Sequence, residues 1–381
     1  MILFRPGSHL DLLITLLSFV GEYPVSSLYL LGNERVFKAM VRELTLPQSF
    51  HNSITGEKLQ LRLLTIAGKH PNKTIRLCRQ AMPLLDWVGT REFYLSVYDR
   101  HNFSGSLSHV ERNHRVAETA AMFLRAGIEC RPWLLPKLQM RQRQLIVENP
   151  SFYFPREIKQ IEDGELNKTK FTRLTGGLFR PGSCFVVYNT RNAVMKWNGM
   201  GEFKTKNDLL AIGRVNAAVS AVDSAILFGM SYEVAIDILL ATAAMKRCEL
   251  RFDSIYQHIY FIPLDAFGIR QLAFLQLSNW NEEILELLFD PETRSYDNGS
   301  FEYDALVDGR YVLSFLNGDI ARLIRFRDAA MDRRRSYEVL CYPEQFPFLR
   351  AYLPEHVRLK TIGISLIEEN LGVKARCLLE R

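Results

Sequence analysis

A chain of 381 residues exceeds the usual domain size of roughly 100–200 residues, so two or three domains are expected. Its composition, 48% hydrophobic and 24% charged, is that of a globular protein and excludes an extended disordered chain. The formal net charge of +6 is unevenly spread, because residues 1–206 carry 29 Lys and Arg against 17 Asp and Glu, whereas residues 207–381 carry 19 against 25. The asymmetry predicts a front half that meets phosphate groups and an acidic rear half.

The cysteines and the apolar runs indicate the compartment. The six cysteines are far apart and none forms a Cys-x-x-Cys pair, which argues against a zinc ribbon or a dense disulfide framework. The first residues lack a basic region followed by a long apolar core, so they are not typical of a signal peptide. Because no uninterrupted apolar run reaches about 18 residues, we expect a soluble, cytoplasmic protein with no membrane partner.

The start of the chain has the pattern of a winged helix-turn-helix. An apolar helix is predicted over His9–Val20, and a tight turn at Gly32–Asn33 leads into a second helix over Glu34–Leu44. The latter carries three cations spaced three to four residues apart, which places them on one helical face. A helix that lies in a DNA groove requires such a face, so double-stranded DNA is the first partner to consider.

A wing is expected after the second helix. Thr55–Gly56 is predicted to form its tip, and Leu59–Lys69 its return strand. The candidate DNA contacts from the helix and the wing are Arg35, Lys38, Arg42, Lys58, Arg62 and Lys69. We expect this winged-helix domain to cover residues 1–100, with a strand over Arg91–Val97 near its end.

Beyond the winged helix, predicted strands alternate with predicted helices, which is typical of an α/β sheet. One helix is predicted over Ser108–Leu124, where His114 and Glu118 share a face, and it ends at Gly127. We divide the rest into an α/β domain over residues 105–206 and an acidic α/β domain over residues 207–381, the latter serving interaction or dimerisation. The fold class is therefore α/β (α+β).

A catalytic alternative rests on the triplet that contains Glu202 and Lys204. In a strand, residues two apart share one face, so this carboxylate and ammonium would point the same way. Metal-dependent nucleases use such a pair, the acid holding Mg²⁺ and the Lys orienting the attacking water, and Glu118 would be a second acid. A lone Glu-x-Lys is common, however, and is more often a solvated edge pair.

Several short motifs resemble one family. The front half is similar to the winged-helix proteins of plasmids and conjugative elements grouped as replication-relaxation proteins, in which the resemblance implies a DNA-binding winged helix joined to a restriction-endonuclease-like α/β domain. This chain departs from active nucleases of that fold, because it has no acid between Glu165 and Glu202 where an Asp should precede the Glu-x-Lys by one strand. The motifs that carry the resemblance are Leu12–Leu17, Val25–Leu28, Val36–Leu44, Leu64–Lys69 and Leu107–Val110.

These observations favour a double-stranded DNA-binding protein of a mobile element, acting in replication, transfer or transcriptional control, without catalysis and without a cofactor. Two alternatives stay open. One is a Mg²⁺-dependent nuclease that uses Glu202, Lys204 and Glu118. The other is a protein-interaction module whose winged helix is degenerate, with a homodimer or another protein bound through the acidic rear half.

Overall fold

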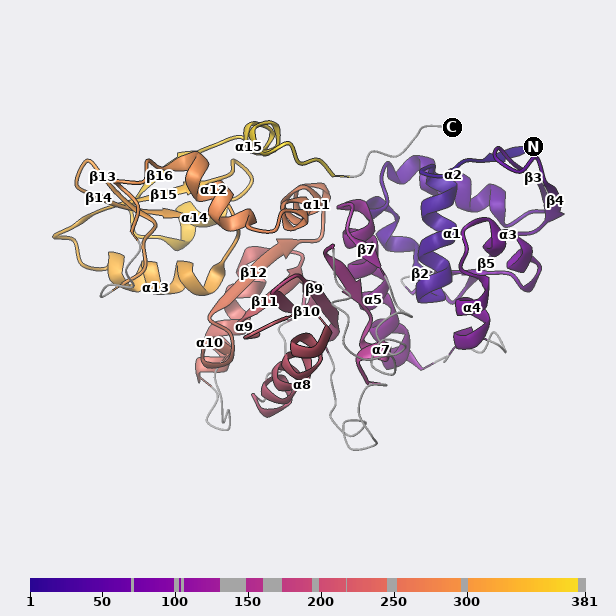
Figure 1. Cartoon of the computed structure of the whole chain (residues 1–381), viewed down its shortest axis with the longest axis horizontal. Coiled ribbons are helices and arrows are strands. Elements are labelled where there is room, and N and C mark those ends of the chain that lie inside the picture. The colour runs from indigo at the N-terminus through magenta and orange to yellow at the C-terminus, as the bar shows by residue number, and fades with distance from the viewer. Residues whose placement is uncertain are drawn as a thin grey trace.

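Three units follow one another along the long axis of the molecule (Figure 1). We call them the N-terminal unit (residues 1–98), the central unit (residues 106–276) and the C-terminal unit (residues 280–375). The fold is mixed α/β, as the sequence predicts, and none of the described helices is long and apolar enough to cross a membrane. The computed structural model describes residues 1–69, 72–98, 103, 106–130, 149–159, 173–193, 199–216, 218–244, 252–295 and 301–375.

The N-terminal unit is built around helix α1 (His9–Val20), whose leucines are buried on all sides. Ser8 caps its start by accepting a hydrogen bond from the Asp11 amide at 3.2 Å. The helix ends at Gly21, where φ is 75° and a Cβ would come within 2.7 Å of the Tyr98 ring, so both the conformation and the space require glycine. The predicted helix boundaries are confirmed here.

Two small sheets surround α1. One has the strand order β1-β3-β4 and the other β2-β6-β5. The remaining elements of this unit are β1 (Ile2–Phe4), β2 (Glu22–Pro24), the 3₁₀ helix η1 (Val25–Leu30), α2 (Glu34–Leu44), β3 (Gln48–Asn52), β4 (Lys58–Leu61), β5 (Leu64–Ala67), β6 (Thr74–Leu77), η2 (Arg79–Ala81), α3 (Met82–Trp87) and α4 (Arg91–Tyr98).

The return strand predicted over Leu59–Lys69 is not one strand, because these residues include parts of β4 and β5, which belong to different sheets. Thr55 and Gly56 form the turn of the β3–β4 hairpin, whose outer strand pairs only with β3. β5 instead pairs with β6, and β6 pairs with β2, the strand that follows α1. The loop between Ala67 and Thr74, which we call the β5–β6 loop, therefore joins two strands of the sheet that contains β2.

The strand expected over Arg91–Val97 is wrong, because these residues form helix α4. Phe93, Leu95 and Val97 alternate with polar residues, which favours a strand. In the structure Tyr94 is fully buried and Leu95 is exposed, so burial does not follow the alternation. Packing of α4 against α1 overrides the local pattern.

The central unit contains one six-stranded sheet in the order β12-β11-β10-β9-β8-β7. β10, β11 and β12 are parallel, whereas β9 is antiparallel to both of its neighbours. Its elements are α5 (Leu107–Arg125), β7 (Glu129–Cys130), β8 (Ser151–Tyr153), α7 (Pro155–Lys159), β9 (Leu174–Arg180), β10 (Ser183–Arg191), α8 (Met200–Asn216), β11 (Ser224–Gly229), α9 (Tyr232–Ala244), α10 (Phe252–Ile255), β12 (His258–Pro263), α11 (Ala266–Ala273) and η4 (Phe274–Gln276).

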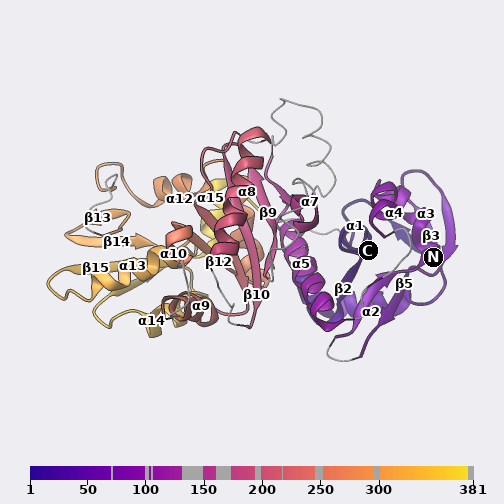
Figure 2. The same ribbon diagram turned by 90° about the horizontal axis from the view of Figure 1, so that it is seen from below.

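The two faces of this sheet are covered by different helices. On β10, Phe185 and Val187 belong to the core shared with α5 and the N-terminal unit, whereas Val186 and Tyr188 belong to the core shared with α8 and α9. Successive side chains of a strand point to opposite faces, so α5 and α8 lie on opposite sides of the sheet. Figure 2 shows α5 between the sheet and the N-terminal unit.

The expected domain boundary between residues 206 and 207 does not exist in the structure. It falls inside α8, and β11 and β12 on one side of it belong to the same sheet as β10 on the other. A fragment that begins at Asn207 would lack β10. The edge of β11 that pairs with β10 would then have no hydrogen-bond partners. Residues 207–381 are therefore not a separate folding unit, since a parallel sheet needs all its strands to bury its two faces.

The C-terminal unit carries a second parallel sheet. Its strand order is β13-β14-β15-β16, with β13 antiparallel to β14 and the other neighbours parallel. Its elements are α12 (Trp280–Leu288), β13 (Ala305–Val307), β14 (Arg310–Ser314), α13 (Ile320–Ala330), β15 (Ser336–Cys341), α14 (Phe346–Tyr352), β16 (Arg358–Thr361) and α15 (Ile364–Leu371).

A buried ion pair joins this unit to the central sheet. Asp319 caps α13, accepts from the Ile259 amide at 3.1 Å and lies 2.8 Å from Nδ1 of His258 on β12. Burial by itself lowers the pKa of His258, but the hydrogen bond and the charge of Asp319 raise it more, so it ends above 6.5. Burial raises the pKa of Asp319, and the same contact more than reverses that effect.

Replacing His258 with Gln should therefore destabilise the protein in a pH-dependent way. A raised pKa in the folded state gives stability that is complete below the unfolded pKa and is lost as the pH rises through the folded one. The difference in free energy of unfolding between wild type and His258→Gln should be clear at about pH 6 and small at about pH 9. Urea denaturation at both pH values checks this, and a constant difference would contradict it.

Candidate functional site

The three predicted cations of α2 lie on its exposed side. Arg35, Lys38 and Arg42 are all exposed, and Asn33 caps the helix by accepting from the amides of Arg35 and Val36 at 3.0 and 3.4 Å. The opposite side is apolar and buried, and consists of Phe37, Met40, Val41 and Leu44.

One of these cations has an ion-pair partner. Nζ of Lys38 lies 2.6 Å from Oε1 of Glu34, and both side chains are more than 40% exposed, at 46% and 43%. An exposed pair at this spacing contributes only about 0.3–0.5 kcal/mol, so Lys38 can exchange this partner for a phosphate. All three cations are therefore accessible to a ligand.

The other predicted contacts are exposed but come from different places. Lys58 is on β4 and Arg62 lies between β4 and β5, so neither is in the β5–β6 loop. Lys69 is in that loop, and so is Lys73, which is exposed and which the sequence analysis missed. If the pairing of β5 with β6 had been known, Lys73 would have been identified as a residue of the same loop as Lys69. The pairing of β6 with β2 has no local signal in the sequence.

The turn before α2 is anchored to the central unit. The hydroxyl of Tyr23 donates to the Ser27 carbonyl at 2.7 Å, and the Ser27 hydroxyl on η1 donates to Oε1 of Glu118 on α5 at 2.5 Å. Tyr29, also on η1, lies with its hydroxyl 3.9 Å from the sulfur of Met230 at the end of β11. The 3₁₀ helix η1 before α2 thus packs on α5 and the carboxyl edge of the central sheet.

Glu118 is the centre of a buried polar cluster. Its side chain is 5% exposed and receives two hydrogen bonds from Arg191, from Nε at 2.8 Å and from Nη2 at 2.7 Å. This two-point geometry is the strong form of an Arg–carboxylate pair. Arg191 adopts a left-handed conformation with φ of 54°, and its amide donates to Oδ1 of Asn189 at 3.0 Å. The end of β10 is thus shaped to reach Glu118.

Asn189 brings two further arginines to this cluster. Its Nδ2 donates to the Arg115 carbonyl at 3.1 Å and its amide donates to the Arg173 carbonyl at 3.1 Å. Burial, together with the charges of Arg173 and Arg191, lowers the pKa of Arg115 to about 10. The guanidinium of Arg115 keeps one exposed partner, Glu111, at 3.3 Å.

α5 also holds the N-terminal unit through His114. Its Nε2 lies 3.0 Å from the Thr74 hydroxyl on β6. Burial, and then the nearby charges of Arg191, Arg76 and Arg115, lower the pKa of His114 to about 4. The imidazole is therefore neutral at pH 7, and its role here is a polar contact between units.

The Glu-x-Lys site is contradicted by the structure. Glu202 and Lys204 lie in α8, not in a strand, and residues two apart on a helix project from different sides. Oε2 of Glu202 accepts from the Gly199 amide at 3.0 Å, as a capping carboxylate does three residues into a helix, whereas Lys204 is exposed. Burial raises the pKa of Glu202.

Glu118 cannot serve as the second acid beside Glu202. Glu118 bonds to Asn189 and Arg191, which face α5, whereas the charge of Glu202 acts on Tyr188, which faces α8. The two carboxylates are therefore on opposite faces of the sheet. Within the part of the chain that the structure describes, no group of three or more His, Cys, Asp or Glu side chains could hold a metal ion.

On the face of the sheet beside Glu118, polar side chains lie together at the strand ends, as they do in a metal site built on strands. They are not carboxylates. At the end of β10, the two residues that face α5 at a spacing of two are Asn189 and Arg191, an amide and a guanidinium. On β9 the neighbouring side chain is Thr175, whose hydroxyl lies 3.3 Å from that of Thr119 on α5. An Mg²⁺ site would need carboxylates at these strand positions.

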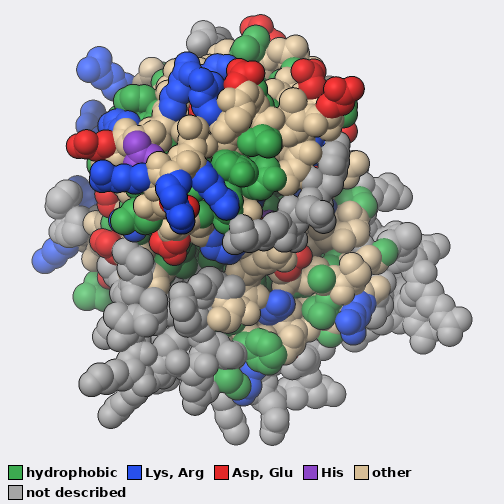
Figure 3. Space-filling view, turned by 90° about the vertical axis from the view of Figure 1, so that its left-hand side faces the viewer, with side chains coloured by type: hydrophobic (Ala, Val, Ile, Leu, Met, Phe, Trp, Pro, Cys, Tyr) green, Lys and Arg blue, Asp and Glu red, His purple; other side chains and the backbone are tan. Residues whose placement is uncertain are grey.

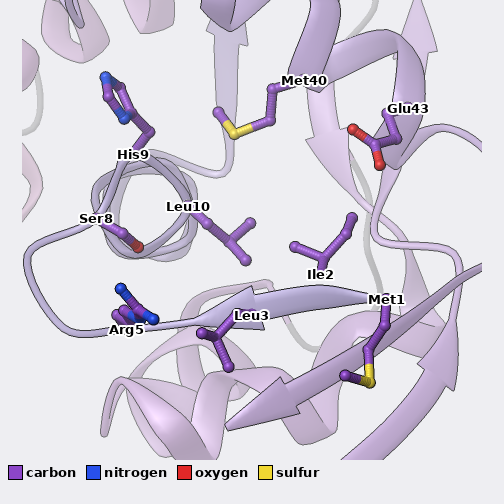
Figure 4. A pocket seen from close by; sticks show the side chains of 9 residues that line it. All are labelled: Met1, Ile2, Leu3, Arg5, Ser8, His9, Leu10, Met40 and Glu43. Carbon is purple, nitrogen blue, oxygen red and sulfur yellow. The ribbon is translucent and has the colours of Figure 1, made fainter. Parts of the chain in front are cut away.

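A pocket of about 240 Å³ lies on the other flank of α2, between β1, the start of α1 and the end of α2. Figure 4 shows the apolar side chains of Ile2, Leu10 and Met40 along its middle, with Glu43 at one end and Arg5 toward the other. This volume is below the roughly 300–1,000 Å³ of most small-molecule sites.

Comparisons with known proteins give no precedent for this arrangement. No family model, no curated protein and no solved structure matches the chain. The similarity of the front half to replication-relaxation proteins therefore stays an expectation from short motifs.

The Glu118–Arg191 pair gives a stability prediction. Glu118→Gln should cost about 3–5 kcal/mol of unfolding free energy, because it leaves the buried guanidinium of Arg191 without its counter-charge. Glu118→Gln combined with Arg191→Gln should cost clearly less than the sum of the two single changes. Urea denaturation measures this cycle. Asp86→Asn, which removes the partner of Arg91 from a pair whose side chains are 44% and 53% exposed, is the control and should cost less than about 1 kcal/mol; additive costs at 118 and 191 would contradict the pairing.

The lowered pKa of His114 predicts that the protein loses stability in mild acid. Because its folded pKa is about 4 and the unfolded value is 6.5, only the unfolded chain takes up its proton between these values. From about pH 7.5 to about pH 5 the wild type should lose about 2 kcal/mol more than His114→Gln. Equal losses in the two proteins would show that this imidazole titrates normally.

Proposed function

We propose that the protein binds double-stranded DNA through its N-terminal unit, with α2 in a groove and the β5–β6 loop on the backbone. The observation that carries the proposal is the exposed side of α2, where Arg35, Lys38 and Arg42 face solvent opposite a buried apolar side. A helix that lies in a DNA groove runs beside the phosphates of the backbone, and three cations on one exposed face can contact them.

The arrangement of strands supports this proposal. In chain order, α1, β2, η1 and α2 match a helix, a strand and a helix-turn-helix, and a two-stranded ribbon of β5 and β6 follows after the β3–β4 hairpin. The ribbon pairs with β2, so it belongs to the same unit as α2. Lys69 and Lys73 in that loop are exposed and add two charges for backbone contacts.

The rigid base of the helix-turn-helix supports it as well. Ser27, two residues before Tyr29 on η1, is held by Glu118, which Arg191 holds in turn. A recognition helix whose support is fixed needs little ordering on binding, which lowers the entropic cost of association.

A protein partner for α2 is the competing interpretation, and the exposed side chains of α2 favour DNA. Docking into a protein groove would require an apolar stripe on the exposed side. The apolar residues exposed among the cations there are Val36, which is 37% exposed, and the small Ala39, and these two do not form a stripe. The charge of the face therefore suits phosphates better than an apolar groove.

The test is to replace the three cations together. Arg35→Gln, Lys38→Gln and Arg42→Gln should weaken binding of a labelled duplex and reduce the slope of log K against log salt by about 2 to 3, since each phosphate contact contributes about 0.9. Fluorescence anisotropy over a salt series measures both quantities. The fold should be retained, because all three side chains are exposed.

A matched control removes three cations elsewhere. Arg91→Gln, Lys204→Gln and Arg214→Gln lie on α4 and α8, all exposed, and Arg91 has a surface partner, Asp86, at 2.7 Å just as Lys38 has one. This variant should bind the duplex as wild type does. If the α2 variant and the control bind equally well, the proposed role of α2 is wrong.

A further inference from the structure

The C-terminal unit carries a basic surface at the edge where its parallel strands begin. Because β14, β15 and β16 are parallel, their first residues lie at the same edge of the sheet. Figure 3 shows that Lys and Arg side chains gather around a histidine on this end of the molecule. The surface, which we call the C-terminal basic face, consists of Arg310, Arg333, Arg334, Arg335 and Arg358 near that edge, together with Lys360, which lies two residues further along β16.

Few acids neutralise this face. Glu338 on β15 is shared by two arginines, with Nη1 of Arg310 at 3.9 Å and Nε of Arg358 at 3.5 Å. Arg334 pairs with Asp332 at 3.0 Å but is 89% exposed. The other three cations, Arg333, Arg335 and Lys360, have no ion pair among the described residues, although the exposed acids Asp308 and Glu355 lie on neighbouring turns.

Part of the face is held in place by aromatic rings. The guanidinium of Arg335 lies over the rings of Phe301 and Tyr311, at 5.2 and 5.5 Å from their centroids. The ring of Tyr337 lies 6.2 Å from that of His356, which is exposed. Fixed cations lose less conformational freedom on binding than free ones do.

Two of the acids in residues 207–381 are engaged elsewhere. Glu302 and Asp304 lie in a network with Arg322, in which the N–O distances are 3.1 and 2.7 Å, and Arg325 is 2.9 Å from Glu302. The net charge of this half thus does not describe its exposed end.

We propose that the C-terminal basic face binds the phosphate backbone of nucleic acid, as a second contact surface separate from α2. This inference rests on the DNA-binding function proposed above. Cations on β16 also discourage pairing of an edge strand with another chain, which accounts for Arg358 and Lys360. That role does not account for Arg333, Arg334 and Arg335, which lie on the loop before β15.

The position of the face indicates what it does for binding. The N-terminal and C-terminal units are at opposite ends of the long axis, with the central unit between them (Figure 1). A short duplex bound on α2 therefore leaves the C-terminal basic face free. One chain can then hold two short duplexes, or two segments of one longer DNA.

The test uses the full-length chain with Arg333→Gln, Arg334→Gln and Lys360→Gln. These are exposed cations, one of them ion-paired, so Arg91→Gln, Lys204→Gln and Arg214→Gln again serve as the matched control. Titration of a short labelled duplex at low salt, followed by calorimetry and anisotropy, gives stoichiometry and affinity. Wild type and the control should bind two duplexes per chain, and the new variant one, with a total salt slope lower by about 2 to 3.

The outcomes separate the two proposals. If the new variant binds as wild type does while the α2 variant loses a duplex, the inference fails and the proposed function stands. If only the new variant loses a duplex, the C-terminal basic face binds DNA and the proposed role of α2 fails. Binding of an acidic peptide that this variant abolishes, with its duplex binding unchanged, would overturn the inference in favour of a protein partner. An unchanged melting temperature shows that the fold is intact.

Discussion

The carboxylate of Glu118 is buried where three parts of the molecule meet, and it ties them together. The Ser27 hydroxyl on η1 and, from the end of β10, the Asn189 amide and the Arg191 guanidinium all donate to its two oxygens. A buried charge is tolerated only when it is paired and hydrogen-bonded, so each of these partners has to stay in place for the others to be stable. This constraint fixes the orientation of the N-terminal unit on the central sheet, and with it the side of the molecule on which α2 is presented.

The same constraint bears on chemistry. A carboxylate clamped by a guanidinium at two points has little capacity left for a metal ion, and its strand neighbours are an amide and a hydroxyl, Asn189 and Thr175. α5 and the strand ends are placed as they would be in a metal site built on strands. The residues there instead join parts of the structure to one another. The polar cluster of the central unit therefore supports the N-terminal unit that carries α2.

The charges of the chain are organised by surface and not by sequence half. The front half is basic in sum, and its exposed cations on α2 and the β5–β6 loop agree with that sum. The rear half is acidic in sum, but Glu302, Asp304 and Asp319 are consumed by partners inside the C-terminal unit or at its junction with β12. What remains at the far edge of the second sheet is a set of arginines. Net charge is a statement about a composition, whereas a partner meets only exposed groups.

The sequence by itself determined the elements whose signal is local. α1 and α2 were predicted with their observed bounds, because an apolar period near 3.6, the turn at Gly32 and the cap at Asn33 all lie within a few neighbouring residues. The exposure of Arg35, Lys38 and Arg42 followed from the same period. The α/β class followed from alternating elements.

Only the tertiary structure decided which strands pair and which side chains meet. The pairing of β6 with β5 and β2 divided the return strand predicted over Leu59–Lys69 between two sheets, and the continuity of the sheet from β10 into β11 removed a domain boundary placed inside α8. The polar cluster joins Ser27, Glu118 and Arg191, residues far apart in the chain, so spacing along the sequence carries no trace of it. Glu202 and Lys204 looked like a strand pair because a triplet has no period of its own, and the capping contact at Gly199 decided for a helix. Long-range pairing is selected by burial of a whole core, which no short window of residues contains.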